Sequence, residues 1–419
     1  MEDRGLVSTN RGIPVTTPEK SPSSPAVPIL SYAELNANPH EVYQAFRSQY
    51  PYLRREDGAY IILRAKDVQA FLSDPRTRQV ETEALAARGI SSGPIMEFVS
   101  NSMLFSNGDA HRRRRHPLTK SFAFRLMGDL RPKIRTLAEE LLSENISAGK
   151  MKLRDDYAAL IPAITIAGVL GIPKADVPLF TSMAYQVSRV LTTSWTPEDV
   201  PGMEAATRDL RDYAANLIAE RRRLPRNDFL SEYVAKVDED AEMSAIEAVM
   251  QIVSVILGGS DTTRAAIVIQ TSLLIERPDI WQALCADPEL TAPAVAEALR
   301  YEPSVGSIPR LSLEEIVLDG YAIPRGSFMV LSTLSSMRDP DLFPNPNEFD
   351  LLRDRPKWHP VFGGGEHRCL GEALAKIEME EALSALTRSQ LKFKLQSGPL
   401  RIHGHAGIRS VDELEVQWM

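Results

Sequence analysis

The sequence predicts a mainly helical protein with a minor β component. Helical patterns of apolar residues dominate from Ala110 to about residue 240. A second and unusually long helical pattern runs from Ser244 to Glu276. Strand-like alternation is limited to short segments, of which residues 391–395 alternate most cleanly. These observations together indicate a large helical domain that carries a small sheet.

The length and composition are those of a globular chain with enough apolar material for a core. The chain has 419 residues, of which 43% are apolar and 25% are charged. That length alone suggests two or three domains. No linker interrupts residues 29–419, however, so we expect a single domain there. Residues 1–28 carry prolines among serines, threonines and charges, and we expect them to form a flexible Pro/Ser-rich arm.

Charge and hydropathy exclude several classes of protein. The formal net charge of −8 argues against general nucleic-acid binding. The amino-terminal arm lacks the apolar segment of a secretory signal, and no stretch approaches the roughly 18 apolar residues of a membrane span. Two cysteines, Cys285 and Cys369, exclude a disulfide framework and the multi-cysteine zinc patterns. We therefore expect a cytoplasmic protein with no membrane anchor and no nucleic-acid partner.

The elements outside the long helix are predicted in chain order. Residues 59–63 indicate a strand, and residues 66–72 indicate a helix that ends before the following Asp-Pro pair. Residues 81–105 are expected to be loop with a short helix. The helical region after residue 110 is expected to break near residues 171–173, which combine glycine and proline. Near the carboxyl terminus, residues 414–416 are expected to pair with the strand at 391–395.

The long helix has clear start and stop signals. Ser244 and Glu247 match a capping box, in which each side chain bonds to the other residue's backbone amide. Pro278 marks the end of the pattern. The centre of the pattern contains Gly258 and Gly259, although a glycine inside a helix costs up to about 1 kcal/mol relative to alanine. The glycine pair therefore indicates close packing, a kink or room for a ligand.

Residues 362–371 are the segment most informative about chemistry, and they read Phe-Gly-Gly-Gly-Glu-His-Arg-Cys-Leu-Gly. The three glycines remove side-chain bulk, so the backbone can approach a large flat ligand. A helical pattern follows Leu370, so Cys369 is expected at the positive end of a helix dipole, which lowers the pKa of a thiol. A thiolate on iron donates electron density and favours O–O cleavage. The alternative is a structural cysteine beside a glycine-rich turn.

The spacing Phe-x-x-Gly-x-His-x-Cys-x-Gly resembles the haem-binding loop of the cytochrome P450 family. The resemblance implies a soluble, bacterial-type member with the family's triangular, mainly helical fold, a long central helix and a small β-rich region. It implies one haem b, with Cys369 as its iron ligand and with Phe362, His367 and Gly371 in the cofactor site. It also implies O2 as a co-substrate.

The run Gly-Gly-Ser-Asp-Thr-Thr at 258–263 is similar to the oxygen-binding groove of the same family. By this resemblance, Gly258 and Gly259 make room for dioxygen beside the iron. Asp261 is the acid and Thr262 the alcohol that deliver protons during oxygen activation. Such delivery requires both groups within hydrogen-bond reach, directly or through one water molecule.

Two further motifs occur in the family order. Glu297 and Arg300 are three residues apart and can pair on one helix face, and Arg353 follows a Phe-Asp pair. A Glu-x-x-Arg pattern alone is common on helix surfaces. Because of its position between the long helix and the cysteine segment, the set resembles the structural cluster that supports the P450 core near the haem.

Cationic residues match the family's contacts to the haem propionates. His111 and Arg115 are similar to the propionate-binding helix, and Arg310 and His367 resemble further contacts of bacterial members. Arginine suits a carboxylate because its donors form a fork. For each of them the alternative is a solvated surface charge.

Arg112, Arg113 and Arg114 lie between two of these residues and cannot all face a haem. A run of charges is often only a solvated face. The alternative is a basic patch on an acidic protein that steers an acidic electron donor such as a ferredoxin.

The resemblance implies a haem-thiolate monooxygenase that receives electrons from NAD(P)H through a separate ferredoxin reductase and ferredoxin. The segments that would line the substrate pocket are mostly aliphatic and favour a small apolar substrate, for example a terpenoid-like molecule; they are residues 81–105, 181–195, 253–257 and 305–308. One alternative is a peroxide-driven or otherwise non-monooxygenase haem-thiolate enzyme, and another is a haem sensor.

Overall fold

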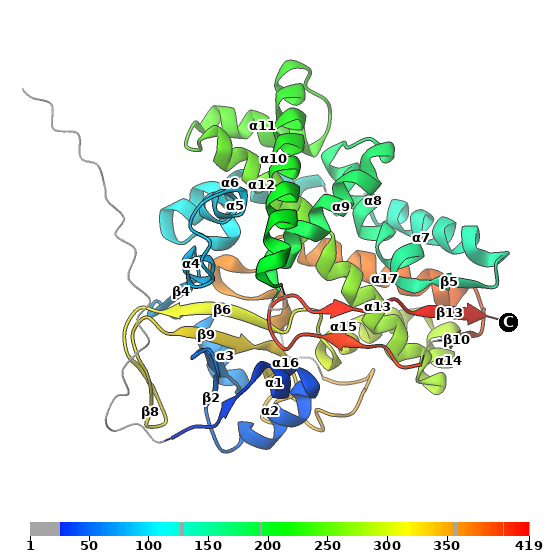
Figure 1. Cartoon of the computed structure of the whole chain (residues 1–419). Coiled ribbons are helices and arrows are strands. Elements are labelled where there is room, and N and C mark those ends of the chain that lie inside the picture. The colour runs from blue at the N-terminus through cyan, green and yellow to red at the C-terminus, as the bar shows by residue number, and fades with distance from the viewer. Residues whose placement is uncertain (1–25, 126–129, 193–194, 355–358, 397, 419) are drawn as a thin grey trace, which may run out of the picture.

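The structure is a computed structural model that describes residues 26–125, 130–192, 195–354, 359–396 and 398–418. Helices occupy the upper and right-hand part of the view in Figure 1, and the largest sheet lies at the lower left. The predicted mainly α fold with a minor β component is confirmed. Residues 1–25 of the predicted arm lie outside the described residues. Val27 already packs against a hydrophobic cluster, and the Pro28 carbonyl accepts from the Arg54 amide at 3.0 Å, so the packed part begins before residue 29.

The described residues of the region predicted as helical form six α-helices, with one short strand among them. The helices are α6 (Gly108–Arg125), α7 (Leu130–Ile146), α8 (Leu160–Leu170), α9 (Val177–Ser188), α10 (Val200–Arg223) and α11 (Phe229–Asp240). The predicted break after α8 is present, where Gly171 caps the helix in the left-handed conformation with a φ of 64°. Strand β5 (Lys150–Lys152) was not predicted, because three residues carry too little alternation to be distinguished from a loop.

The remaining helices precede and follow this region in the chain. Before it lie α1 (Tyr32–Ala37), α2 (Pro39–Arg47), α3 (Ala65–Phe71), α4 (Glu83–Ala87) and α5 (Pro94–Asn101), and after the central helices lie α14 (Pro278–Ala286), α15 (Thr291–Tyr301), α16 (Thr333–Ser336) and α17 (Glu372–Arg388). The predicted helix at 66–72 corresponds to α3. Two helices, α4 and α5, occupy the segment predicted as mainly loop.

The largest sheet has six strands in the order β1-β2-β3-β9-β6-β4. They are β1 (Ile29–Leu30), β2 (Tyr52–Arg55), β3 (Tyr60–Ile62), β4 (Thr77–Gln79), β6 (Ser307–Ser312) and β9 (Phe328–Ser332). The predicted strand at 59–63 is β3. Only this one of the six strands was predicted, and the other five were missed.

The carboxyl-terminal pairing is confirmed. Strand β10 (Phe393–Leu395) pairs antiparallel with β13 (Glu415–Trp418), and β13 also pairs with β5. Two small hairpin-like pairs complete the β structure, namely β7 (Ile316–Leu318) with β8 (Tyr321–Ile323) and β11 (Ile402–His403) with β12 (Ser410–Val411).

The long central helix is divided into α12 (Ala245–Gly258) and α13 (Asp261–Ile275). The predicted capping box is present, with the Ser244 amide 2.9 Å from the Glu247 carboxylate and the Glu247 amide 3.3 Å from the Ser244 hydroxyl. The helical pattern is interrupted at Gly259 and Ser260, which agrees with the kink that the glycine pair left open. Gly259 caps α12, and the Ser260 hydroxyl donates to the Ile256 carbonyl at 2.7 Å. The glycine pair thus marks an interruption at the centre of the fold.

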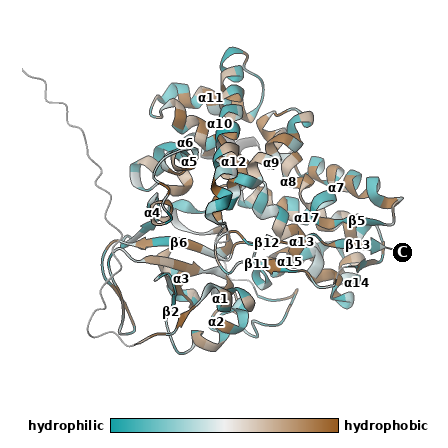
Figure 2. Cartoon of the chain, viewed as in Figure 1, coloured by the Kyte–Doolittle hydropathy of each residue, from teal (hydrophilic) through white to brown (hydrophobic). Residues whose placement is uncertain are grey.

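The hydrophobic core also divides at this interruption. Apolar residues of α12 pack in one cluster with α8, α9 and α10, whereas those of α13 pack in a second cluster with α7, α15 and α17. Figure 2 shows hydrophobic and hydrophilic residues alternating on outer helices such as α7 and α10. Within the described residues, the stretch Ala245–Ile275 is long and apolar enough to cross a membrane, so the expectation that no stretch approaches a membrane span is wrong. Of its most apolar window, 78% is buried inside the protein.

Candidate active site

A cavity of about 340 Å³ lies where the two core clusters meet. Its walls are mostly aliphatic, and all four segments expected to line a substrate pocket contribute to it. Those contributions are Met103 and Leu104; Leu191; Ser254, Val255 and Leu257; and Val305 and Ile308. The cavity is therefore the place where the sequence predicts substrate and cofactor to meet.

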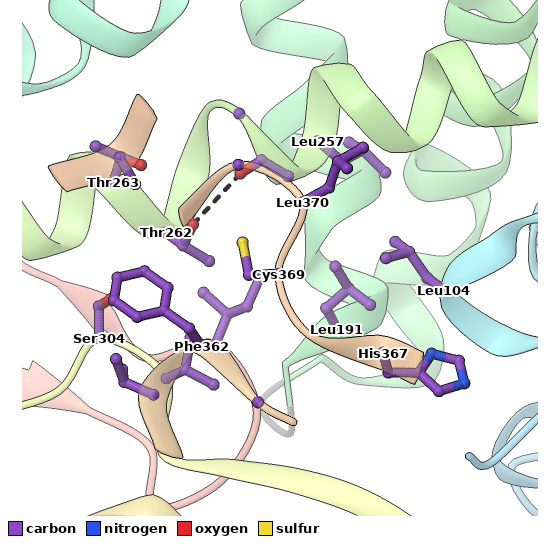
Figure 3. A pocket seen from close by; sticks show the side chains of 18 of the residues that line it. Leu104, Leu191, Leu257, Thr262, Thr263, Ser304, Phe362, His367, Cys369 and Leu370 are labelled. Carbon is purple, nitrogen blue, oxygen red and sulfur yellow. Dashed lines mark hydrogen bonds between the residues drawn. The ribbon is translucent and has the colours of Figure 1, made fainter. Parts of the chain in front are cut away.

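The cysteine loop forms one wall of this cavity. Cys369 is exposed to it and lies two residues before Gly371, the cap of α17. The Cys369 amide donates to the Phe362 carbonyl at 2.8 Å, which closes the loop. Figure 3 shows the sulfur among the side chains of Thr262, Phe362 and Leu370. Phe362 and Gly371 also line the cavity, so the structure brings the loop residues together as predicted.

The expected lowering of the thiol pKa is wrong for the protein chain by itself. Although Cys369 is exposed to the cavity, desolvation by the surrounding protein raises the pKa of its thiol, and this effect exceeds the opposing influence of the Gly371 amide and of Arg115. A helix end stabilises a thiolate only partly when the surroundings exclude water. A coordinated metal cation is the stronger means of deprotonating such a thiol.

The glycines of the loop are needed for contact with the protein as much as with a ligand. Gly365 has a φ of +59°, and a Cβ there would lie 2.8 Å from the Leu72 carbonyl. A Cβ on Gly364 would lie 3.1 Å from the Leu72 side chain. The end of α3 thus presses directly on the cysteine loop, and a side chain at either glycine would displace it.

Two arginines, the buried Arg310 and the partly buried Arg115, line the cavity without a carboxylate partner. Arg115 donates to the Arg368 carbonyl at 2.6 Å, and Arg310 donates to the Leu72 carbonyl at 2.6 Å. Neither makes an ion pair with any residue that the structure describes. Burial lowers the pKa of both guanidinium groups, because a buried cation without an anion is unfavourable. The pair is therefore suited to anionic groups of a bound ligand.

The two histidines of the predicted cofactor site lie one behind the other. Their ring centroids are 4.0 Å apart, and only His367 lines the cavity. Burial, together with His111 and Arg310 nearby, lowers the pKa of His367 to about 3 and keeps it neutral. The ring nitrogens of His111 lie 3.0 Å from the Met103 carbonyl and 3.1 Å from the Glu366 carbonyl. His111 thus ties the cysteine loop to the segment before α6 and lies behind the cavity wall, and its contact with a propionate stays a prediction.

The interrupted central helix provides the other polar groups. Gly258, Gly259 and Thr262 line the cavity, and the Thr262 hydroxyl lies 3.5 Å from the Gly258 carbonyl (Figure 3). Asp261 does not line the cavity. Its carboxylate is paired with Arg264, whose guanidinium lies 3.8 Å from the centroid of the Tyr185 ring on α9. The structure thus brings the predicted alcohol to the cavity and turns the predicted acid toward a cation.

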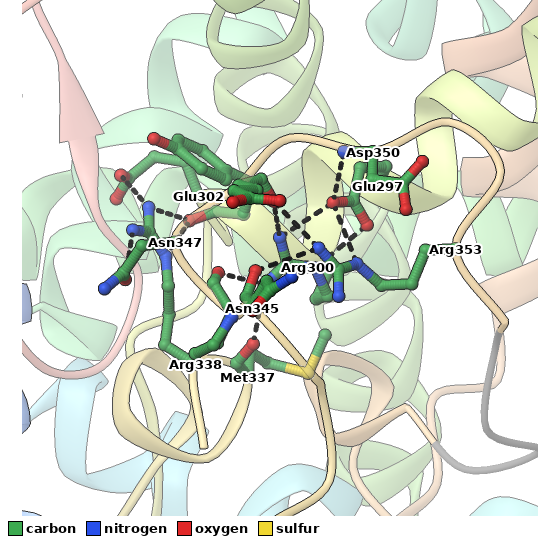
Figure 4. Close-up of polar contacts among 12 residues, drawn as sticks. Glu297, Arg300, Glu302, Met337, Arg338, Asn345, Asn347, Asp350 and Arg353 are labelled. Carbon is green, nitrogen blue, oxygen red and sulfur yellow. Dashed lines mark hydrogen bonds and ion pairs between the residues drawn. The ribbon is translucent and has the colours of Figure 1, made fainter. Parts of the chain in front are cut away.

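The predicted structural cluster is assembled behind the cavity (Figure 4). Arg300 donates to both carboxylate oxygens of Glu297 at 2.9 and 2.7 Å, and Arg353 donates to the same carboxylate at 3.2 Å. Arg300 also donates to the carbonyls of Met337, Pro346 and Glu348. These bonds attach residues 337–348 to α15, whose Leu299 lines the cavity.

The three consecutive arginines have different surroundings. Arg112 is exposed, with its side chain 58% accessible, whereas Arg114 is buried and pairs with Glu247 at 2.8 Å. Arg113 is partly exposed and pairs with the same carboxylate. The prediction that Arg114 contacts a redox partner at the surface is therefore wrong, because Arg114 is buried and its charge neutralises Glu247, the capping-box glutamate of α12. Arg112 remains the exposed member of the set.

Sequence reasoning missed several residues of the site. Ile408, Ser304 and Ile166 line the cavity from loops and a helix with no recognisable motif. Glu378 of α17 also lines it and is buried, and burial raises the pKa of its carboxyl well above the usual value. Its signal in the sequence was a glutamate on the apolar face of the helix after Cys369, one residue after Ile377 and four after Leu374.

Comparison with known proteins agrees with this geometry. A family model described as Cytochrome P450 matches residues 179–402. The plant-inducible cytochrome P450-pinF1 of Rhizobium radiobacter is 43% identical over 392 residues, which cover 94% of this chain and 92% of that protein. The chain therefore belongs to the cytochrome P450 family. It is an oxidoreductase that incorporates oxygen from O2, with haem as its cofactor.

More distant relatives extend the same result. Vitamin D(3) 25-hydroxylase of Pseudonocardia autotrophica is 30% identical and covers 86% of this chain and 88% of its own length. Nocardicin C N-oxygenase of Nocardia uniformis subsp. tsuyamanensis is 31% identical, with 90% and 95% covered. The crystal structure of CalO2 superposes with a TM-score of 0.86 at 28% identity, with 92% of this chain and 97% of CalO2 covered.

The residues present fit iron protoporphyrin IX. Cys369 offers one sulfur ligand, the walls are mostly apolar, and Arg115 and Arg310 are two cations at the cavity wall available for two propionates. When bound, the haem supplies the iron at which O2 is reduced and activated.

Proposed function

We propose that the protein is a monooxygenase that inserts one oxygen atom from O2 into a small apolar molecule. Its electrons come from NAD(P)H through a separate ferredoxin reductase and a ferredoxin. The observation that carries this proposal is the cavity itself, in which Cys369 and Thr262 are set among aliphatic side chains. We further propose that this reaction takes place in the cytoplasm.

Thr262 is proposed to hold a proton-donating hydroxyl at the cavity wall. Asp261 is the adjacent acid, and its contribution requires that it turn away from Arg264. General acid–base groups of this kind contribute about 10²–10⁴-fold to a rate. Loss of the hydroxyl is therefore expected to affect oxygen chemistry more than substrate binding.

Thr262→Ala tests this role, with Thr262→Ser as the matched control that keeps the hydroxyl. We expect the alanine variant to convert most NAD(P)H into hydrogen peroxide rather than product and the serine variant to restore product. Equal product per NAD(P)H in all three proteins would contradict the role of Thr262. Product formed with hydrogen peroxide but not with the ferredoxin system would favour the peroxide-driven alternative.

The proposed substrate is apolar and of medium size, such as a terpenoid. Val255, Val305 and Ile408 line the cavity, and the hydroxyls of Ser304 and Thr263 are among its few polar groups. Because one relative is named as plant-inducible, plant-derived apolar compounds belong in the first screen. Optical titration of the holoenzyme should show a shift of the Soret band with neutral apolar compounds. A shift only with highly charged compounds would contradict the proposal.

The proposed ferredoxin site lies on the face that carries Arg112. This side chain lies 3.7 Å from Glu366 of the cysteine loop, so a docked donor would be close to Cys369. Arg112→Glu should slow reduction by a ferredoxin most strongly at low salt, because screening weakens exposed charges at high ionic strength. Arg325→Glu, an exposed arginine in the turn before β9, is the control. Equal rates for both variants at every salt concentration would refute the assignment.

A further inference from the structure

We propose that a buried ionic cluster shapes the substrate end of the cavity without lining it. The Glu302 cluster consists of His40, Glu302, Arg338 and Arg409, which come from four separate parts of the chain. Glu302 and Arg409 are assigned as positioning residues that fix where Val305 and Ile408 stand against the substrate.

Glu302 is the centre of the cluster, and Figure 4 labels it together with Arg338. It follows the last residue of α15, and its side chain is only 12% exposed. Its carboxylate oxygens lie 3.1 and 3.0 Å from Nε2 of His40 on α2. Arg409 donates to the same carboxylate, and Arg338 lies 3.8 Å from it. Two buried arginines thus depend on one largely buried carboxylate for their neutralisation.

Arg409 fastens two cavity-lining segments to each other. Its backbone amide donates to the Ser304 carbonyl at 2.9 Å, and its guanidinium donates to the Pro303 carbonyl at 3.1 Å. The guanidinium also donates to the Gly404 carbonyl at 2.9 Å. One side chain therefore joins the segment after α15 to the carboxyl-terminal loop at residues 404–409.

As a consequence, the segment after α15 and the carboxyl-terminal loop are held in a fixed register beside the cavity. Val305 and Ile408 form an isolated antiparallel bridge, and the Gly306 amide donates to the Gly407 carbonyl at 2.8 Å. Ile408 in turn donates its amide to the Leu191 carbonyl at 3.2 Å. Val305, Ile408 and Leu191 all line the cavity, so three wall residues from three segments share one attachment.

Gly407 shows how closely these segments meet. It has a φ of +62°, and a Cβ there would overlap the Leu191 carbonyl oxygen. The backbones of the carboxyl-terminal loop and of the segment after α9 are therefore in direct contact at this residue. A shift of Arg409 must therefore move Ile408, rather than be absorbed by space nearby.

Lysine cannot replace Arg409 in this arrangement. The guanidinium presents several donors in a rigid fork and serves Glu302, Pro303 and Gly404 at once, whereas an ammonium is a compact charge on a flexible stem. Arg409→Lys keeps the charge, so the cluster stays neutralised, but it releases the carbonyl contacts. The variant thus separates positioning from charge balance.

The test measures how the holoenzyme binds imidazole and 1-alkylimidazoles with butyl, octyl and dodecyl chains, by optical titration. The affinity for imidazole measures access to the iron, and the added affinity from the alkyl chain measures contact with the cavity wall. In the wild type, affinity should rise by up to about fourfold for each methylene that is buried. In Arg409→Lys we expect imidazole to bind within twofold of the wild type and the dodecyl compound to bind at least tenfold more weakly.

Two further variants and a second readout complete the test. His40→Ala should show a smaller change of the same kind, and Arg401→Lys, an exposed arginine of the same region, should show none. Hydrogen–deuterium exchange of the peptide covering residues 402–411 should be faster in Arg409→Lys. The proposal would be overturned if Arg409→Lys exchanged this peptide at the wild-type rate and also showed the wild-type dependence of affinity on alkyl-chain length. Equal weakening of imidazole and dodecylimidazole would also overturn it, since it would show general damage to the haem site.

Discussion

Glu297→Gln is the perturbation that most directly tests the cluster behind the cavity. Glutamine keeps the shape of the side chain and removes its charge. The side chains of Arg300 and Arg353, which are 2% and 7% exposed, would then share no carboxylate. Their remaining partners are backbone carbonyls of residues 337–348.

The expected cost is set by the burial of both cations. Breaking a buried ion pair by removing one partner destabilises a protein by about 3–5 kcal/mol, because an uncompensated charge remains. For 419 residues, an unfolding entropy of about 2.1 cal/mol/K per residue converts this into a decrease of about 3–6 °C in Tm.

The assay is thermal unfolding of the holoenzyme, followed by far-UV circular dichroism and by the Soret band. Arg388→Gln is the matched control, because Arg388 pairs with Glu139 at 3.9 Å and both side chains are about half exposed. An exposed pair contributes only about 0–1 kcal/mol, so its Tm should change by about 1 °C or less. Equal Tm values for Glu297→Gln and the control would refute the reasoning.

Three further predictions concern the cofactor site and the Glu302 cluster. Arg310→Leu should speed haem transfer to apomyoglobin by about 10–150-fold, because it removes a charge-assisted hydrogen bond to a propionate worth about 1.5–3 kcal/mol. An equally large increase in the control variant Arg325→Leu would contradict this prediction. Gly365→Ala should lower the haem content of the purified protein because its Cβ would meet the Leu72 carbonyl, whereas Gly168→Ala, where a Cβ meets nothing within 4 Å, should not. Burial alone would raise the pKa of Glu302, but Arg409 and His40 outweigh it and lower that pKa to about 2 from 4.5. This stabilisation, on the order of 3 kcal/mol, is present above about pH 4.5 and lost as the pH falls toward 2. The difference in unfolding free energy between wild type and Glu302→Gln should therefore shrink below pH 4.5, and a constant difference would contradict the shift.

Motifs with fixed local spacing were predicted well from the sequence. The cysteine loop, the capping box of α12 and the cluster of Glu297, Arg300 and Arg353 all form as their spacing indicates. In the loop, the capping box and the Glu297–Arg300 pair, neighbouring residues already restrict the geometry, whereas the position of Arg353, 56 residues from Glu297, was indicated by the resemblance to the family.

Features that depend on distant contacts were not predicted. The six-stranded sheet joins segments as far apart as β3 and β9, and no local pattern announces such pairing. The pKa of Cys369 is raised because of the surrounding fold, although its place before α17 favours a thiolate. Arg114 looked like part of a surface run, and only its pairing with Glu247 shows that it is buried.

The Glu302 cluster illustrates the same limit. Glu302 and Arg409 are 107 residues apart, and neither belongs to a recognisable motif. Their importance follows from where the fold brings them, which is beside two loops that line the cavity.

The most direct test of a haem held by the Cys369 thiolate is the absorption spectrum of the dithionite-reduced protein with carbon monoxide. It is measured for the wild type and for Cys369→Ser. We predict a strongly red-shifted Soret band in the wild type and its loss in the variant. A wild-type band typical of histidine-ligated haem, or the red-shifted band unchanged in Cys369→Ser, would contradict the account.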